Sequence, residues 1–159
     1  MIILGIDPGY DRVGIGIIER LNNYDTYIHS ECIETDKNES FVDRLRQIEN
    51  RLVEIIAIYR PELTVIEDIY FAKNAKTAIK VAQARGVILI TCRKYINNSI
   101  LELTPMQIKS SLVGDGHADK DQIKYMVTQI LKINTLNKLD DEIDALSISL
   151  AGIQHYKSY

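Results

Sequence analysis

The order of strand-like and helix-like segments constrains the fold of this chain more than any other feature of its sequence. Ile2–Asp7 is apolar almost throughout, which is typical of a strand buried at the centre of a sheet. Pro8-Gly9 and Asn22-Asn23 carry turn signals, and alternating segments follow them. The pattern predicts five strands, at Ile2–Asp7, Arg12–Glu19, Tyr24–Thr35, Leu63–Glu67 and Ser99–Leu103.

Capping residues and helical spacing account for most of the remaining chain. Ser40 is placed to cap a helix that ends before Pro61, because proline disfavours helical geometry in the residue before it. Thr104-Pro105-Met106-Gln107 has the form of a capping box with proline at the first helical position. The expected helices begin after Ser40, Asn74, Thr104 and Asp119 and at about Asp140, and the last one ends near His155.

This order predicts an α/β fold. Three consecutive strands pair as antiparallel hairpins, whereas the strand–helix–strand steps that follow add parallel strands through right-handed crossovers. The result is a mixed five-stranded sheet with helices on both faces, which is the RNase H-like architecture. The chain has no internal repeat and no linker, so we expect a single domain over residues 1–159.

The charge is unevenly distributed along the chain. The net charge of −3 argues at first against a nucleic-acid partner. However, residues 1–71 hold seven Lys or Arg against fourteen Asp or Glu, whereas residues 72–124 hold nine against four. A basic middle third can hold a phosphate backbone, although lysines on solvated helix faces would give the same count.

Nothing in the sequence predicts export or membrane insertion. No basic segment precedes the first strand, and no apolar run approaches the roughly 18 residues that a membrane span requires. Cys32 and Cys92 have no metal-ligand spacing, so we expect two buried thiols in a reducing compartment. The expected location is the cytoplasm.

Two acidic residues follow apolar strand segments directly. Asp7 ends the first strand beside the Pro8-Gly9 turn, and Glu67 ends the segment TVIE. Asp7 would suit a simple turn cap. However, a buried carboxylate is costly unless it is paired or binds a cation. Two strands that both end in acids therefore suggest a shared site at one edge of the sheet.

The start of the last helix contributes two more acids. Asp141 and Asp144 are three residues apart, so they share one helix face. The helix dipole explains one acid in the first turn. It does not explain why Asp144 is grouped with Ala145, Ala151 and Gly152, which allow a helix to lie close to a sheet. We therefore expect Asp144 to point toward the strand ends.

Four carboxylates from two strands and a helix suit hard divalent cations. Mg²⁺ prefers oxygen ligands and keeps several waters, so a few acids and a substrate phosphate complete its shell. Two such ions about 3.5–4 Å apart can support phosphodiester hydrolysis. The candidate metal ligands and catalytic residues are Asp7, Glu67, Asp141 and Asp144, with Mn²⁺ as a possible substitute for Mg²⁺.

Several segments resemble one known family. GIDPGYDRVGIGII, VIEDIYFAKNAKTAIKVAQARGV, QIKSSLVGDGHADKDQI and DDEIDALSIS, in this order, closely resemble the RuvC family of Holliday-junction resolvases. The resemblance runs from about residue 2 to about residue 155. The AKNA…QARG stretch and the DALA-like end, which here has the sequence DALS, are specific to this family, whereas the opening IDxG is shared by many RNase H-like proteins.

The resemblance implies roles for particular residues. Asp7, Glu67, Asp141 and Asp144 match the four catalytic acids of the family. Tyr70 matches an aromatic residue that stacks on bases at the junction centre, where phenylalanine is commoner, although it could instead anchor a loop. Lys109 and Lys120 match basic residues implicated in DNA contact and catalysis. The implied products are ligatable nicks with 5′-phosphate and 3′-hydroxyl ends.

Three lysines and a stripe of small residues bear on DNA contact and assembly. Lys73, Lys76 and Lys80 are three and four residues apart, so they share a helix face where they could neutralise phosphates or simply be solvated. The resemblance implies a homodimer and a branch-migration motor complex as partners. The stripe of Ala78, Ala82 and Gly86 could form the dimer contact or pack in the core.

Three rival functions stay open on the sequence. An actin-like or sugar-kinase-like phosphotransferase also has an Asp-x-Gly phosphate loop, but it needs two such domains. A junction-binding module without chemistry would bind four-way DNA and leave it uncut. An RNase H-like nuclease that acts on RNA would lack the AKNA…QARG region.

Overall fold

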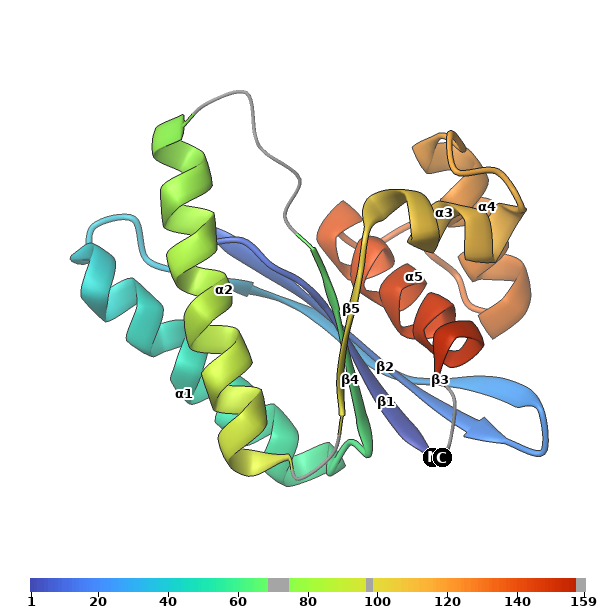
Figure 1. Cartoon of the computed structure of the whole chain (residues 1–159), viewed down its shortest axis with the longest axis horizontal. Helices are drawn as coiled ribbons and strands as arrows, with labels where there is room; N and C mark the ends of the chain where they lie inside the picture. The colour runs from blue at the N-terminus through green and yellow to red at the C-terminus, as the bar shows by residue number, and fades with distance from the viewer. Residues whose placement is uncertain (69–74, 97–98, 157–159) are drawn as a thin grey trace.

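A mixed five-stranded sheet forms the centre of the protein, in the order β3-β2-β1-β4-β5 (Figure 1). The structure is a computed structural model that describes residues 1–68, 75–96 and 99–156. β1 pairs antiparallel with β2 and parallel with β4, as predicted. The strands are β1 (Ile2–Asp7), β2 (Arg12–Leu21), β3 (Tyr24–Glu34), β4 (Leu63–Glu67) and β5 (Ile100–Leu103).

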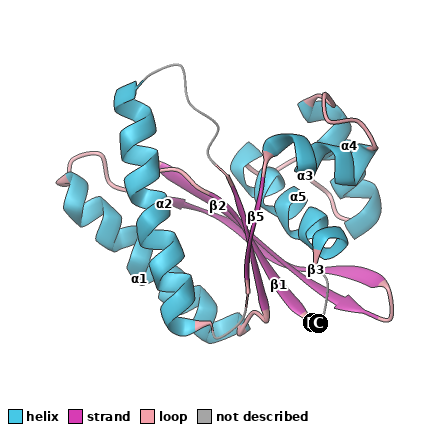
Figure 2. Ribbon diagram, viewed as in Figure 1, coloured by secondary structure: helices cyan, strands magenta, loops and turns pink. Residues whose placement is uncertain are grey.

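Helices cover both faces of the sheet, which confirms the predicted architecture (Figure 2). They are α1 (Phe41–Tyr59), α2 (Ala75–Tyr95), α3 (Pro105–Val113), α4 (Lys120–Leu131) and α5 (Asp140–His155). α1 and α2 enclose one apolar core with the sheet, and α3, α4 and α5 enclose a second core on the opposite face. Among the described residues, no helix is both long and apolar enough to span a membrane.

The predicted caps explain where the helices begin. The Ser40 hydroxyl accepts a hydrogen bond from the Asp43 N–H at the start of α1. Capping boxes open α3 at Thr104 and α4 at Asp119, where each side chain bonds the backbone three residues on. The predicted cap at Asn74 lies outside the described residues.

The two cysteines differ in burial. Neither forms a disulfide. Cys92 is a residue of α2 and is buried in the core, as predicted, but Cys32 is only half-buried. The prediction was wrong for Cys32 because it lies on β3, which is the outer strand on its side of the sheet.

α5 lies with its backbone directly against β1 and β2. A Cβ atom at Gly5 would collide with the Ala145 carbonyl and would lie 2.6 Å from the Ser149 nitrogen. The Ser149 hydroxyl donates to the Gly16 carbonyl at 2.8 Å, which ties the helix to β2. Ala145 and Ala151 are fully buried in this contact. The small residues of the last helix therefore allow the close packing that the sequence predicted.

We predict that Gly5→Ala destabilises the fold. The new methyl group meets backbone atoms of α5 that cannot move independently, so the free energy of unfolding should fall by about 1–3 kcal/mol. Urea denaturation at low protein concentration measures this change. Gln129→Ala is the control, because Gln129 is exposed on α4 and alanine favours the helix, so stability should not fall. Equal loss of stability in both variants would contradict the proposed collision.

Candidate active site

Asp7 and Glu67 lie at the same end of the sheet. They end the adjacent parallel strands β1 and β4, in which Ile6 pairs with Ile66. On the other side of Asp7, Gly14 of β2 lies directly opposite in the antiparallel register. Parallel neighbours place their carboxyl ends at one edge, so the two acids meet there as the sequence predicted.

The first turn of α5 brings Asp141 and Asp144 to the same place. A Cβ atom at Gly14 would collide with the Asp141 carbonyl and would lie 3.1 Å from the Asp7 Cβ atom. Gly14 therefore allows the helix to begin directly beside Asp7. Three elements that are far apart in the sequence place Asp7, Glu67, Asp141 and Asp144 within electrostatic reach of one another.

Burial and mutual repulsion make ionisation of this cluster unfavourable. Burial, followed by the charges of Glu67, Asp144 and Asp141, raises the pKa of Asp7 to about 7. Burial and the Asp144 charge raise the pKa of Glu67 to about 7, although Lys109 and Lys120 act in the opposite direction. Burial also raises the pKa of Asp144. A cation at this position would offset the repulsion, which is the setting that favours a metal ion.

Positive groups surround the acids. Lys120 Nζ lies 3.5 Å from Asp144 Oδ2, and the Asp144 charge raises the pKa of Lys120. Lys109 and Lys120 also line a hollow of about 260 Å³ between β4, α3, α4 and α5, together with Glu67 and Asp144. A hollow lined by both acids and lysines suits an anionic substrate, because the lysines attract the anion and the acids can bind a metal ion beside it.

The donor atoms fit a hard divalent cation, although the side chains do not form a ready-made coordination sphere. In the described part of the chain, no three His, Cys, Asp or Glu side chains are gathered closely enough to hold a metal ion. Arg12 Nη1 lies 3.7 Å from Asp141 Oδ2, and Lys120 lies beside Asp144, so two of the four acids form ion pairs with basic side chains. Carboxylate oxygens completed by water and phosphate are nevertheless the ligands that Mg²⁺ takes.

The chain matches one protein family over nearly its whole length. The model described as Crossover junction endodeoxyribonuclease RuvC matches residues 3–152. RuvC of Caldicellulosiruptor saccharolyticus is 43% identical over 154 residues, covering 96% of this chain and 92% of that protein. RuvC of Petrotoga mobilis is 42% identical, covering 100% of this chain and 97% of that protein. The chain belongs to the RuvC family.

A solved structure agrees with the fold. The T. thermophilus RuvC in complex with Holliday junction substrate has a TM-score of 0.90 and 29% identity, and the match covers 98% of this chain and 94% of that chain. The RNase H-like prediction is therefore confirmed. Members of the RuvC family are metal-dependent nucleases, which is consistent with the carboxylate cluster.

One acid at the start of α5 has a structural role. Glu142 accepts the Leu139 N–H at 3.1 Å and the Ser30 hydroxyl at 2.6 Å. Lys138 Nζ donates to the Ser30 hydroxyl at 2.7 Å and lies 3.4 Å from the Glu142 carboxylate. This network ties the first turn of α5 to β3, and it thereby holds Asp141 and Asp144 over the end of the sheet.

Sequence reasoning missed two arginines at the edge of the site. Arg12 opens β2 and reaches Asp141. Arg85 of α2 donates through Nε to the Glu67 carbonyl at 3.4 Å and pairs with Asp68 at 3.4 Å. Both lie inside segments that resemble the family, so an assignment of every charged residue in those segments would have included them.

The predicted DNA-binding residues are only partly described. Tyr70 and Lys73 lie outside the described residues, and only the backbone of Lys76 is described. Lys80 is exposed on α2, with Nζ 5.1 Å from the Tyr10 ring centroid. Tyr10 lies in the turn that follows Asp7, so Lys80 is close to the end of the sheet that carries the acids.

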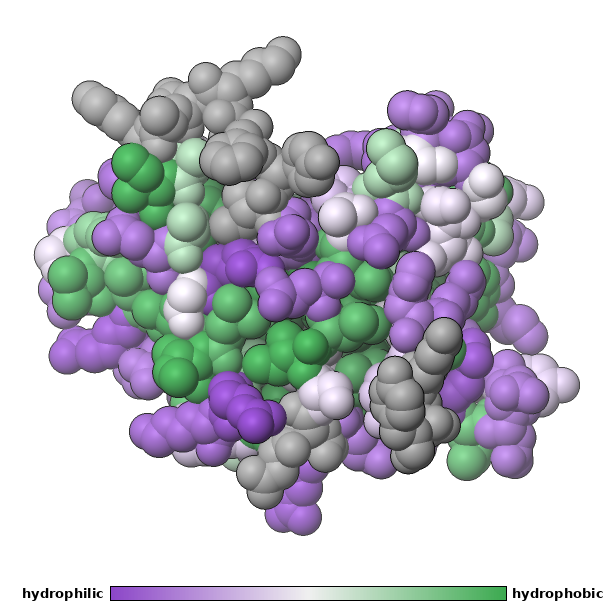
Figure 3. Space-filling model, viewed as in Figure 1, coloured by the Kyte–Doolittle hydropathy of each residue, from purple (hydrophilic) through white to green (hydrophobic). Residues whose placement is uncertain are grey.

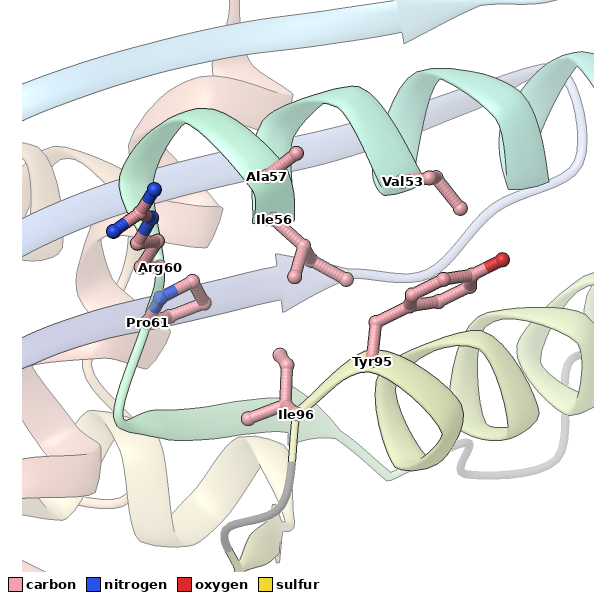
Figure 4. Close-up of a pocket in the computed structure, with 7 residues that line it drawn as sticks. All are labelled: Val53, Ile56, Ala57, Arg60, Pro61, Tyr95 and Ile96. Carbon is pink, nitrogen blue, oxygen red and sulfur yellow. The ribbon is translucent and has the colours of Figure 1, made fainter.

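Another hollow, of about 470 Å³, lies at the opposite end of the sheet (Figure 4). It is formed where α1 and α2 end, between residues such as Ile56, Pro61 and Ile96. Of the described residues that line it, Arg60 alone is charged, and none of the four acids lines it. Its size does not make it a candidate for RuvC chemistry, because the reactive carboxylates lie at the other end.

We predict that the acidic cluster destabilises the metal-free fold as pH rises. The pKa of Asp7 is raised from 3.8 to about 7, so the folded state binds this proton more tightly than the unfolded state. The resulting stabilisation is fully present below about pH 4 and is lost as the pH rises through about 7. Asp7→Asn should therefore raise the free energy of unfolding at about pH 8 by about 2–4 kcal/mol.

Urea denaturation in EDTA across this pH range measures the effect. The exposed residue Glu39 provides the control, and Glu39→Gln should change stability by less than about 0.5 kcal/mol. If Asp7→Asn and the unsubstituted protein had the same stability at about pH 8, burial and repulsion could not act on Asp7 as described.

Proposed function

We propose that this protein resolves four-way DNA junctions by nicking two opposed strands, as an endonuclease of homologous recombination and DNA repair. The observation that carries this proposal is the convergence of four carboxylates from β1, β4 and α5 beside a lysine-lined hollow. Its relatives are named crossover junction endodeoxyribonuclease, and the T. thermophilus RuvC structure holds a Holliday junction substrate. Membership of this family supports the same substrate here.

The four acids would hold the metal. Asp7, Glu67, Asp141 and Asp144 offer carboxylate oxygens suited to Mg²⁺, and we propose two ions, with Mn²⁺ as a substitute. Bound ions of this kind supply a hydroxide nucleophile near neutral pH and stabilise the departing 3′ oxygen. Asp7 and Glu67 contribute charge that is costly without a cation, so they favour ion binding. Asp141 and Asp144 pair with Arg12 and Lys120 here, so these side chains would have to separate for all four acids to hold an ion.

Basic residues would orient the DNA. Lys109 and Lys120 line the hollow beside Glu67 and Asp144, where they can hold the oxygens of the scissile phosphate. Lys73, Lys76 and Lys80 are proposed contacts to flanking phosphates. Tyr70 is proposed to stack on a base at the junction centre.

We predict that Asp7→Asn binds four-way junctions but does not cut them. The substitution removes a metal ligand and keeps the size of the side chain. Loss of a residue that only hydrogen-bonds to a metal ligand lowers activity roughly 10–100-fold, so loss of the ligand Asp7 should lower the cleavage rate by more than that. The assay uses a synthetic junction and a matched linear duplex, each with Mg²⁺ and with EDTA.

The control is Glu39→Gln, which changes an exposed acid in the loop before α1, outside the cluster. It should cut the junction symmetrically and only with Mg²⁺, as the unsubstituted protein should. Junction binding without nicks by the unsubstituted protein would instead support a binding module. Full-rate cleavage by Asp7→Asn would refute the assignment of the acids.

A dimer would place two sites on the two-fold symmetric junction. Ala82 and Gly86 are exposed on α2, and a Cβ at Gly86 meets nothing within 4 Å, so these two residues do not pack in the core of the chain. Ile90 of the same helix is 66% exposed. Figure 3 shows apolar atoms gathered over α2 and the neighbouring β5 edge. We propose α2 as the homodimer contact, and a branch-migration motor as a further partner.

Ala82→Arg is predicted to break this dimer. A charged side chain on the small-residue stripe would prevent close helix approach and would be costly to bury. Sedimentation at micromolar concentration should show a species of about twice the 18.1 kDa chain mass for the unsubstituted protein and a monomer for the variant. Gln129→Arg, an equivalent change on exposed α4, should remain dimeric. A monomeric unsubstituted protein would overturn the α2 interface.

A further inference from the structure

A third hollow lies beside the turn that leaves the acidic end of β1. It has a volume of about 510 Å³ and lies between this turn, the start of α1 and the first turns of α2. Among the residues that the structure describes, the lining consists of Tyr10, Phe41, Thr77, Ile79, Lys80 and Gln83, of which Lys80 alone is charged. Tyr10, which lines the hollow, is three residues beyond Asp7 in the turn that leaves the candidate active site.

Two aromatic rings and one ammonium group meet in this hollow. The Tyr10 and Phe41 rings have centroids 6.1 Å apart at an interplanar angle of 67°. Lys80 Nζ lies 5.1 Å from the Tyr10 centroid and 5.6 Å from the Phe41 centroid. Both rings are only half-buried, whereas Lys80 is exposed. The cation–π contacts therefore involve an exposed side chain, Lys80, which can move from the rings to a nearby anion.

Tyr10 itself is held firmly from within the protein. The buried Arg44 lies with its guanidinium carbon 5.1 Å from the Tyr10 ring centroid. Arg44 Nη2 donates to the Tyr10 carbonyl at 3.3 Å, and Nε donates to the Thr35 hydroxyl at 2.9 Å. Arg44 also forms an ion pair with Asp11, which removes the effect of that acid beside the hollow. The ring is thus preorganised for a ligand and surrounded by little net negative charge.

We propose that Tyr10, Phe41 and Lys80 form a binding subsite for an unpaired nucleotide of the DNA substrate. The base stacks on the aromatic rings, and Lys80 moves from the rings to the phosphate. Half-exposed aromatic side chains beside a lysine are the combination that binds single-stranded nucleic acid without sequence preference. The positive charge of Lys80 favours a nucleotide, which carries a phosphate, over an apolar protein segment without acidic residues. The inference rests on the proposed function, because the turn that carries Tyr10 follows directly on the strand end that carries Asp7.

The test uses the unsubstituted protein and variants in EDTA, so that DNA is bound but not cut. Fluorescent 2-aminopurine is placed at successive positions of an unpaired strand, both in a four-way junction with an unpaired flap and in a single-stranded oligonucleotide. Stacking on Tyr10 should quench the fluorescence at one position. Tyr10→Leu and Phe41→Leu should remove this quenching and weaken oligonucleotide binding by about tenfold each, whereas Tyr10→Phe should preserve both.

Two further variants separate binding from folding. Lys80→Gln changes only an exposed side chain, and it should weaken binding and reduce its salt dependence by about one phosphate contact. Tyr24→Leu is the matched control, because Tyr24 is 78% exposed at the β2–β3 turn, at the other end of the sheet. It should bind both DNAs as the unsubstituted protein does.

The outcomes distinguish this subsite from the proposed function. Unchanged quenching and affinity in Tyr10→Leu, Phe41→Leu and Lys80→Gln would overturn the subsite, even if junctions are bound and cut normally. If these variants bound DNA normally but lost self-association in sedimentation, the hollow would be a protein contact instead. Tyr10-dependent binding of the oligonucleotide without any preference for junctions would support the subsite and contradict the proposed substrate.

Discussion

The direct contact between the backbone of α5 and strands β1 and β2 is the constraint on which the site depends. It exists because glycine replaces a side chain at each point of contact, at Gly5 and Gly14 above all. Any Cβ atom at Gly14 would push the first turn of α5 away from Asp7. The helix would then carry Asp141 and Asp144 out of reach of the strand acids. Packing of small residues thus determines the electrostatics of the site.

The same close packing makes the cluster costly to the fold. Carboxylates that are buried and repel one another keep their protons up to near neutral pH, as the raised pKa values of Asp7 and Glu67 indicate. The two apolar cores on opposite faces of the sheet supply the stability that offsets this cost. A site whose acids repel one another is poised for cations, and family membership in metal-dependent nucleases agrees with that property.

The overall charge of −3 says little about the surface around the site. The basic middle third of the chain contributes α2, α3 and the start of α4, which carry Lys80, Lys109 and Lys120 toward the acidic end of the sheet. Local charge therefore opposes net charge where the substrate would lie. Many acids of the N-terminal half lie in ion pairs, as Glu31 does with Arg51 and Asp25 does with Arg20, and these pairs limit repulsion of DNA.

The sequence by itself determined the elements, their caps, the mixed sheet and the strand ends that carry Asp7 and Glu67, because apolar periodicity and capping are local signals. Only the tertiary structure showed that Glu142 holds α5 to Ser30, 112 residues away, while its neighbours face the site. It alone placed Arg12 and Arg85 beside the acids and gathered Tyr10, Phe41 and Lys80 in one hollow. These contacts join residues from different layers, and they depend on how closely helices pack on the sheet, which no local pattern specifies.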